Sequence, residues 1–167
     1  PIVQGNWDGT GTPDVLSFSR GSNISGYWYD NLDPYQGTIS FWVTPEQDTA
    51  GMGTVYRGLV DLGGSNGARV YLHNNNLYFN VVSSTVAKYS VNWTAGATYF
   101  VVFRWDLKNS LDGTNFFSIS INNVHSFGQM APNAAEDIGS TFYISRIQID
   151  GGFANTLIEG LTIYRRV

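Results

Sequence analysis

The segment from Ser25 to Tyr35 combines flat aromatic rings with planar polar side chains. Its sequence, SGYWYDNLDPY, holds four aromatic residues, two aspartates, one asparagine and a proline. Aromatic rings can lie against the apolar face of a pyranose while amide and carboxylate groups reach its hydroxyls. If the segment is a strand, alternation separates Tyr27 and Tyr29 from Trp28. We therefore expect one or two of these rings to contact sugar and the others to pack inward.

A second polar stretch could belong to the same site. His73 precedes three consecutive asparagines, and asparagine tolerates the left-handed backbone conformation of tight turns. The alternative interpretation of this stretch is a solvated turn without a ligand. The candidate glycan-binding residues are Trp28, Tyr29, Tyr35, His73 and Asn75.

Oxygen ligands for a cation occur in the segment DLKNSLDGTN, residues 106–115. Calcium takes six to eight oxygen ligands, many of them backbone carbonyls. The segment lacks the full EF-hand pattern and its closing glutamate, so a hairpin loop with an Asp-Gly turn is the alternative. Asp106 and Asp112 are the candidate Ca²⁺ ligands, and residues 8–14 form a second, equally ambiguous loop.

No group of residues matches a known type of catalytic site. Glycoside hydrolysis needs two carboxyl groups about 5 to 10 Å apart, and the nearest candidate, residues 46–48, follows a proline at a strand end. We interpret that segment as a solvated loop. Glu159 is a lone acid, and His73 and His125 are isolated in the sequence. The sequence therefore predicts a protein that is not an enzyme, with an enzyme of unrecognised type as the weaker alternative.

Composition narrows the functional classes further. The 167 residues carry a net charge of −4, and only 13% of them are charged, against about 25% in an average protein. The few basic residues are scattered, which excludes the clustered positive face of a nucleic-acid-binding protein. The absence of cysteine excludes disulfides and thiolate metal sites. No apolar run is long enough to insert into a membrane, and a surface rich in Gly, Asn, Ser and Thr favours an extracellular or particle-surface location.

Alternating apolar and polar residues predict strands almost throughout, about ten to twelve of them. Helical periodicity is confined to a short turn near residues 134–137. Asn74-Asn75-Asn76 and Asn122-Asn123 mark tight hairpin turns, and the apolar run 99–105 is typical of a strand buried on both faces. The pattern favours an all-β sandwich or jelly roll. The strands whose bounds can be predicted cover residues 14–19, 37–45, 55–62, 69–73, 77–82, 99–105, 115–121, 124–127, 141–149 and 157–164.

One tryptophan interrupts this alternation. In the segment 37–46, Ile39, Phe41 and Val43 share one face of the expected strand, and Trp42 lies on the opposite, nominally polar face. Two interpretations are open: Trp42 is a platform for a ligand, or it packs against a second layer of the core.

The order of the segments resembles the laminin-G-like branch of the concanavalin A-like jelly rolls. The resemblance rests on DVLSFSR, YQGTISFWVTPE, NNLYFNVVSS, VNWTAGATYFVVFRWDLKNSLDGTNFFSISINN and YISRIQIDGGFANTLIEGLTIYRRV, which together span nearly the whole chain. One departure lies near the end, where the family often has an acidic pair and Glu159 is followed by Gly160. The resemblance implies one domain over residues 1–167, built from two stacked antiparallel sheets of six or seven strands each. Because family members with different ligands share an aromatic residue where Trp42 stands, it favours packing for that residue.

The resemblance implies an interaction module more often than an enzyme. Our leading hypothesis is a non-catalytic glycan-binding or adhesion module of a larger secreted or surface protein, with carbohydrate as its partner. The rival hypothesis is a structural or decoration component of a virus particle, or a subunit of a surface filament. In that case the partners are copies of this chain or a neighbouring structural protein. Neither hypothesis involves nucleic acid or membrane insertion.

Overall fold

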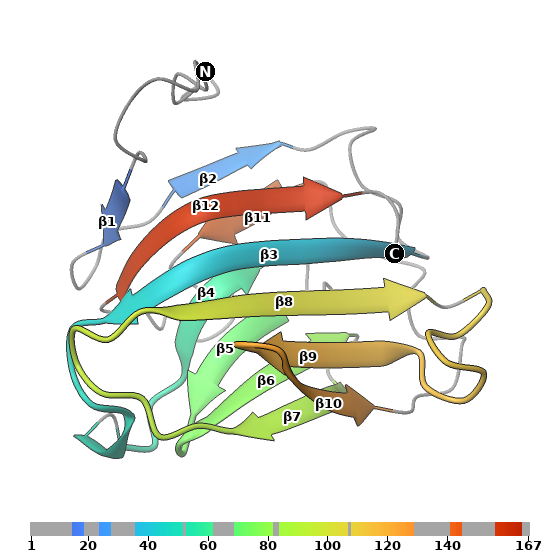
Figure 1. The fold of residues 1–167 in the computed structure, drawn as a ribbon. Coiled ribbons are helices and arrows are strands. Elements are labelled where there is room, and N and C mark those ends of the chain that lie inside the picture. Colours follow the sequence, from blue (N-terminus) through green and yellow to red (C-terminus); the bar gives the residue numbers. More distant parts are fainter. Residues whose placement is uncertain are drawn as a thin grey trace.

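The computed structural model describes residues 15–18, 24–27, 36–51, 53–61, 69–81, 84–106, 108–128, 141–144 and 156–164. These residues form twelve strands and one short 3₁₀ helix, η1 (Thr49–Gly51) (Figure 1). The strands are β1 (Val15–Phe18), β2 (Ile24–Tyr27), β3 (Gln36–Pro45), β4 (Arg57–Asp61), β5 (Arg69–His73), β6 (Asn76–Val81), β7 (Ser84–Ser90), β8 (Tyr99–Asp106), β9 (Phe117–Ile121), β10 (Val124–Gly128), β11 (Thr141–Ile144) and β12 (Thr156–Tyr164).

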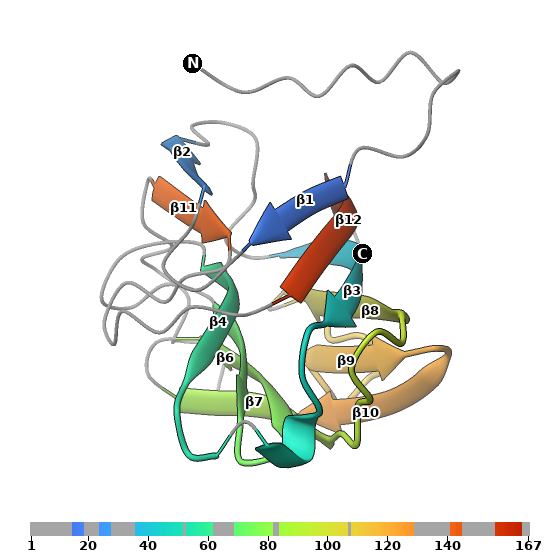
Figure 2. The ribbon, with the colours of Figure 1, turned by 90° about the vertical axis from the view of Figure 1, so that its left-hand side faces the viewer.

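The strands form two antiparallel sheets of six strands each. Sheet A has the order β1-β12-β3-β8-β9-β10, and sheet B has the order β2-β11-β4-β5-β6-β7. The two sheets face each other as the layers of a sandwich, which is clearest when Figures 1 and 2 are compared. This architecture confirms the predicted all-β, two-sheet antiparallel sandwich. No helix among the described residues is long and apolar enough to span a membrane.

Alternation along the strands builds the core between the sheets. The inward residues of β3, namely Ile39, Phe41 and Val43, are fully buried, and those of β8 and β9 continue the same layer. Phe79 of β6 joins the two sheets, because its ring lies 5.6 Å from that of Phe103, 6.1 Å from that of Trp105 and 5.7 Å from that of Phe117. Aromatic residues of both sheets therefore interlock at the centre of the sandwich.

Both predicted asparagine turns are confirmed. Asn74 and Asn75 have φ values of 48° and 57°, and Asn122 and Asn123 have values of 47° and 69°. Positive φ at both central residues is the geometry of the two-residue hairpin turn whose twist matches the flanking strands. The first turn sets the register of β5 on β6, and the second sets that of β9 on β10.

Three expectations about strands were wrong. β8 is not buried on both faces, because Val101, Phe103 and Trp105 are buried while the alternate residues from Phe100 to Arg104 are only partly so. β2 and β7 were not recognised as strands in the sequence. β7, STVAKYS, lacks large aliphatic residues in alternation, and pairing with β6 stabilises it instead. The helical turn expected near 134–137 lies outside the described residues.

The packing interpretation of Trp42 was also wrong. Its side chain is 45% exposed on the outer face of sheet A. The neighbours of Trp42 in the strand, Phe41 and Val43, are fully buried on the inner face. Pleating of an interior strand therefore accounts for the position of the tryptophan, and no second core layer covers it among the residues that the structure describes.

Candidate functional site

Four aromatic rings gather on the outer face of sheet B. Tyr71 of β5 stacks on Tyr78 of β6, with ring centroids 5.1 Å apart and planes 11° from parallel. Tyr56, which immediately precedes β4, stacks on His73 at 4.1 Å and 7° and leans on Tyr71 at 5.4 Å. We call Tyr56, Tyr71, His73 and Tyr78 the ring cluster.

Strand alternation and register assemble the ring cluster. In β5, Val70 and Leu72 point into the core, which leaves Tyr71 and His73 on the outer face. The turn after His73 places Tyr71 directly opposite Tyr78, so the two rings lie side by side. Gly58 of β4 is the other cross-strand neighbour of Tyr71 and has no side chain that would cover it.

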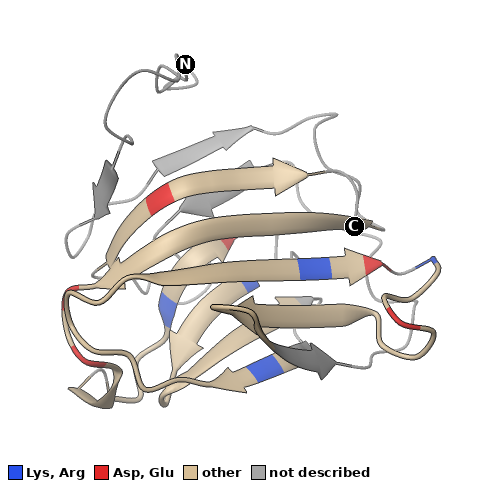
Figure 3. Cartoon of the chain, in the orientation of Figure 1, with Lys and Arg blue, Asp and Glu red and all other residues tan. Residues whose placement is uncertain are grey.

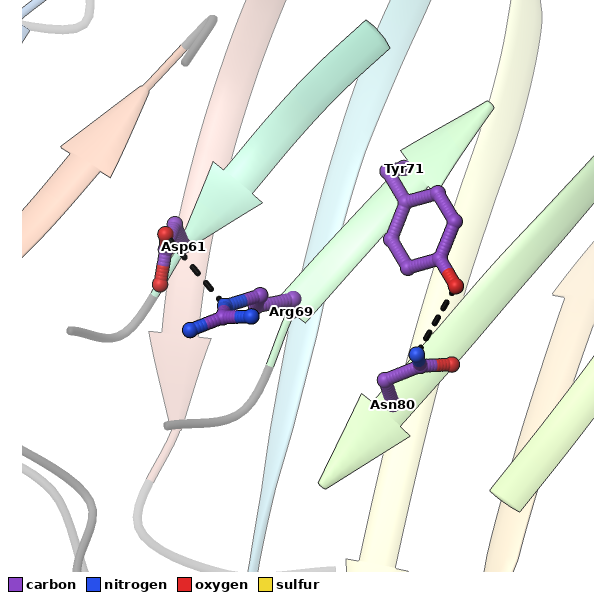
Figure 4. Close-up of polar contacts among 4 residues, drawn as sticks. All are labelled: Asp61, Arg69, Tyr71 and Asn80. Carbon is purple, nitrogen blue, oxygen red and sulfur yellow. Dashed lines mark hydrogen bonds and ion pairs between the residues drawn. The ribbon is translucent and has the colours of Figure 1, made fainter. Parts of the chain in front are cut away.

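The ring cluster has an anchored base and an accessible rim. Tyr71 is buried, and its hydroxyl oxygen accepts a 2.8 Å hydrogen bond from the Asn80 side-chain amide (Figure 4). Tyr56 is 39% exposed, and His73 and Tyr78 are partly exposed. Because the rings brace one another, their faces are held in place before any ligand binds, which reduces the entropy lost on binding.

The charges beside the ring cluster fall into two groups. Asp61 and Arg69 face each other across β4 and β5, with Arg69 Nε 3.5 Å from an Asp61 carboxylate oxygen, and both side chains are buried (Figure 4). Lys88 of β7 lies opposite Tyr78 and is exposed, with its ammonium group 5.6 Å from the centre of the Tyr78 ring. Charged residues are sparse on the strands in Figure 3. Lys88 thus supplies a hydrogen-bond donor at the accessible rim of the ring cluster.

Two polar atoms at the ring cluster have incomplete hydrogen bonding. Nδ1 of His73 and Oδ1 of Asn80 are buried and have no hydrogen-bond partner among the described residues. A buried polar group without a partner destabilises the folded state, and such groups are normally satisfied by protein atoms or ordered water. Both atoms therefore leave hydrogen-bonding capacity unused beside the ring cluster.

The predicted glycan-binding residues divide into two sets. Trp28, Tyr29 and Tyr35 lie outside the described residues, so their role stays a prediction. His73 is a member of the ring cluster. Asn75 lies at the exposed tip of the adjacent turn, where its main-chain carbonyl oxygen accepts a 2.8 Å hydrogen bond from the main-chain amide of Val91.

Sequence reasoning missed three members of this site: Tyr56, Tyr71 and Tyr78. The signal for Tyr71 and Tyr78 was present, since alternation in both strands and the intervening two-residue turn place them opposite each other. Tyr56 carries no such signal, because it precedes its strand and reaches the ring cluster only through the pairing of β4 with β5.

The proposed calcium ligands serve the loop that contains them. Oδ1 of Asp106 accepts hydrogen bonds from the amides of Lys108 and Asn109, both 2.9 Å long. Oδ1 of Asp112 accepts from the amides of Thr114 and Asn115. No group of three or more His, Cys, Asp or Glu residues converges in the described part of the chain. These N–H groups account for the Oδ1 atoms as caps of the loop, and a calcium role for Asp106 and Asp112 stays a prediction.

The hydrogen bonds at Asp112 predict a response to acid. Donation from the Asn115 side chain, and then from the amides of Asn115 and Thr114, lowers the pKa of the Asp112 carboxyl below its ordinary value of 3.8. Because the pKa is lower in the folded state, these hydrogen bonds stabilise the loop fully when the pH is above the ordinary pKa. The stabilisation is lost as the pH falls through the folded-state pKa. We expect the NMR amide signals of Thr114 and Asn115 to stay constant from pH 7 to about pH 5 and to move below about pH 4. Equal movement in Asp112→Asn would contradict this assignment.

Among the described residues, the acids considered for catalysis do not form a recognisable catalytic pair. Glu46 and Asp48 lie in the exposed loop after β3, where Oδ1 of Asp48 accepts a 2.7 Å hydrogen bond from the Ala95 amide. The segment is an exposed loop, as predicted, and Asp48 also fastens it to the segment before β8. Glu159 lies on the outer face of sheet A opposite Trp42.

Comparison with known proteins extends the description of the fold. No protein-family model matches the chain, and no curated protein matches it. Among solved structures, the chain is similar to the botulinum neurotoxin serotype D binding domain, with a TM-score of 0.66, 14% identity, and 91% of this chain and 38% of that chain covered. A structure described by the words "Cell entry of botulinum neurotoxin type C is dependent upon interaction with two ganglioside molecules" has a TM-score of 0.65 and 11% identity, with coverage of 86% and 37%. The native heptameric SAP-like pentraxin from Limulus polyphemus has a TM-score of 0.56 and 16% identity, with coverage of 80% and 65%.

These likenesses define a class of fold. The chain is a two-sheet jelly-roll sandwich of the kind found in these toxin binding domains and in the pentraxin. It spans less than two fifths of the length of the toxin structures.

Proposed function

We propose that this protein is a non-catalytic, laminin-G-like glycan-binding module and that the ring cluster of sheet B contacts the sugar. One observation carries the proposal: the ring cluster presents stacked aromatic faces on an accessible sheet surface beside polar side chains. The described core needs no rings on this outer face, since aliphatic and aromatic residues fill the space between the sheets. Exposed aromatic residues of this kind concentrate at binding sites.

The chemistry of the ring cluster suits a pyranose. The Tyr56 ring face can cover the C–H groups of one sugar face, and the steeply inclined Tyr78 ring can contact the edge of the same sugar. The tyrosine hydroxyls and the Lys88 ammonium group can bond the sugar hydroxyls. The Asn75 side chain lies at the exposed turn beside His73 and can extend the contact to a second sugar unit. Binding here changes no covalent bond and needs no catalytic pair.

The fold comparisons support this proposal. Two of the similar structures are of botulinum neurotoxins. One is a binding domain, and the other is described as concerning a cell entry that depends on interaction with two ganglioside molecules. Gangliosides are glycolipids, so carbohydrate is a reasonable partner class for this sandwich. We propose further that the chain acts in an extracellular or cell-surface setting as part of a larger protein.

A structural subunit of a particle or filament is the second candidate function. Val124, which is 55% exposed in the edge strand β10, favours it, because a neighbouring subunit could cover this edge. The mass of the protein in dilute solution separates the two functions. A monomer supports the glycan-binding module, whereas a stable oligomer supports the structural subunit.

A glycan array with and without a calcium chelator tests the proposed function. We expect binding to defined glycans that persists in chelator, because the oxygens of Asp106 and Asp112 are already hydrogen-bonded within their loop. Loss of binding in chelator would instead show that a metal bridges protein and sugar. No binding under either condition would contradict the proposed function.

A further inference from the structure

Trp42 lies on the opposite side of the sandwich from the ring cluster. Its strand, β3, runs between β12 and β8 in sheet A, and no described strand lies in front of it in Figure 1. The indole is 45% exposed, although an interior strand usually places smaller or polar side chains on a solvated face. A large exposed ring at the middle of a sheet therefore calls for an explanation other than folding.

Residues of both neighbouring strands lie close to the Trp42 indole. Phe100, its cross-strand neighbour on β8, lies with its ring centroid 4.7 Å away and its plane tilted by 41°. On the other side, β12 forms a bulge at Gly160, which has a φ of 56°. A Cβ placed on Gly160 would lie 3.5 Å from Cδ1 of Trp42, so the bulge is in close range of the indole edge. Phe100 and the Gly160 bulge thus flank the Trp42 ring from the two neighbouring strands, and the residue stays exposed between them.

Polar side chains surround this indole on the same face of sheet A. Glu159 is paired directly with Trp42 across the strands, and a carboxylate can accept hydrogen bonds from sugar hydroxyls. Ser40 and Thr44 flank Trp42 two residues away on either side along β3, at about 7 Å. The Thr44 hydroxyl is hydrogen-bonded to that of Thr98 at 2.7 Å.

We propose that Trp42 forms a second sugar-stacking site, specific for neutral sugars and independent of the ring cluster. A protein partner would require a contiguous apolar area, because the buried core of such an interface is more apolar than the surrounding surface. On the described outer face of sheet A, the apolar neighbours of Trp42, namely Phe100, Val102 and Leu157, are only partly exposed, and the other exposed ring, Tyr164, is on a different row, opposite Thr38. Glu159, which is paired with Trp42, would repel an acidic sugar, whereas Arg104 on the same face lies further away, opposite Thr38, so the charge nearest to Trp42 favours neutral sugars.

Two sugar sites on opposite faces would make one chain bivalent. The ring cluster belongs to sheet B and the Trp42 site to sheet A, so the thickness of the sandwich separates them. A single chain could then bridge two glycan strands, and binding to a multivalent surface would exceed the affinity of either site alone.

The test is an NMR titration of the Tyr56→Ala/Tyr78→Ala double variant, in which the ring cluster is disabled. The probes are lactose, cellobiose and N,N′-diacetylchitobiose, and tetramethylammonium chloride is a cation control. The Trp42 indole N–H signal is assigned by its absence in Trp42→Phe. We expect at least one disaccharide to move this signal saturably, while the backbone amide of Tyr164 stays in place.

Two results would overturn the second site. In one, no disaccharide moves the Trp42 indole signal. In the other, only tetramethylammonium moves it, which would identify an aromatic site for cations. Wild-type protein gives the same indole readout if the double variant does not fold. In wild type, the amides of His73 and Tyr78 report on the ring cluster separately, so failure of one site is distinguishable from failure of the other.

Discussion

Replacing both Tyr56 and Tyr78 by alanine is expected to weaken glycan binding through the ring cluster by about 30-fold. Each substitution removes one exposed ring face, and a stacking contact of this kind contributes about 1 kcal/mol, so two contacts contribute about 2 kcal/mol. The exposed or partly exposed positions of both rings limit the effect on folding. Isothermal titration with the best glycan from the array measures the change.

Two controls give this result its meaning. The Tyr56→Phe/Tyr78→Phe variant keeps both rings and removes only the hydroxyls, so its binding is expected to fall much less. Tyr164→Ala removes a tyrosine that is 55% exposed on sheet A, and it is expected to leave binding through the ring cluster unchanged. Equal losses in Tyr164→Ala and in the double alanine variant would show that the ring cluster has no special role.

Replacing Gly37 by alanine is expected to destabilise the protein by about 3 kcal/mol, the upper part of the range for overpacking a core. A Cβ at Gly37 would lie 2.5 Å from Cη2 of Trp105, closer still to Cζ2 of the same ring, and 3.0 Å from the carbonyl oxygen of Tyr164. Trp105 is buried against Phe79, so its indole has little room to move. For a chain of this size, the loss corresponds to a decrease of about 6 to 12 °C in Tm, measured by calorimetry.

Gly51 supplies the matched control for this substitution. A Cβ at Gly51 has no atom within 4 Å, and its backbone lies in the exposed turn η1. Gly51→Ala is therefore expected to change stability by less than about 1 kcal/mol. Trp105→Phe should partly rescue Gly37→Ala by freeing space for the added methyl group. Additive effects in that double variant would contradict a direct clash between the two residues.

Much of the fold was predictable because the chain follows local rules consistently. Alternation identified β3, β5 and β12, and the asparagine pairs identified two hairpin turns that the structure confirms. β7 escaped notice because its sequence has no alternating run of large apolar residues and its pairing with β6 is a tertiary effect. Sheet order was beyond sequence reasoning, since it depends on contacts between segments far apart in the chain.

The candidate site was less predictable than the fold. His73 was chosen for its neighbouring asparagines, whereas the structure links it to Tyr56 through stacked rings. Tyr71 and Tyr78 could have been recognised from strand alternation, but contact with Tyr56 depends on how β4 pairs with β5. The exposure of Trp42 shows the opposite problem: alternation placed it outside, and the resemblance wrongly favoured packing.

An NMR titration of the wild-type protein with the best glycan from the array tests the central claim most directly. The proposed site predicts that the largest amide shifts fall on Tyr56, His73, Tyr78 and Lys88, around the ring cluster. Amides buried between the sheets, such as that of Phe103, should stay unchanged. Large shifts confined to other parts of the molecule, with the ring cluster unmoved, would contradict the assignment of the sugar site to sheet B.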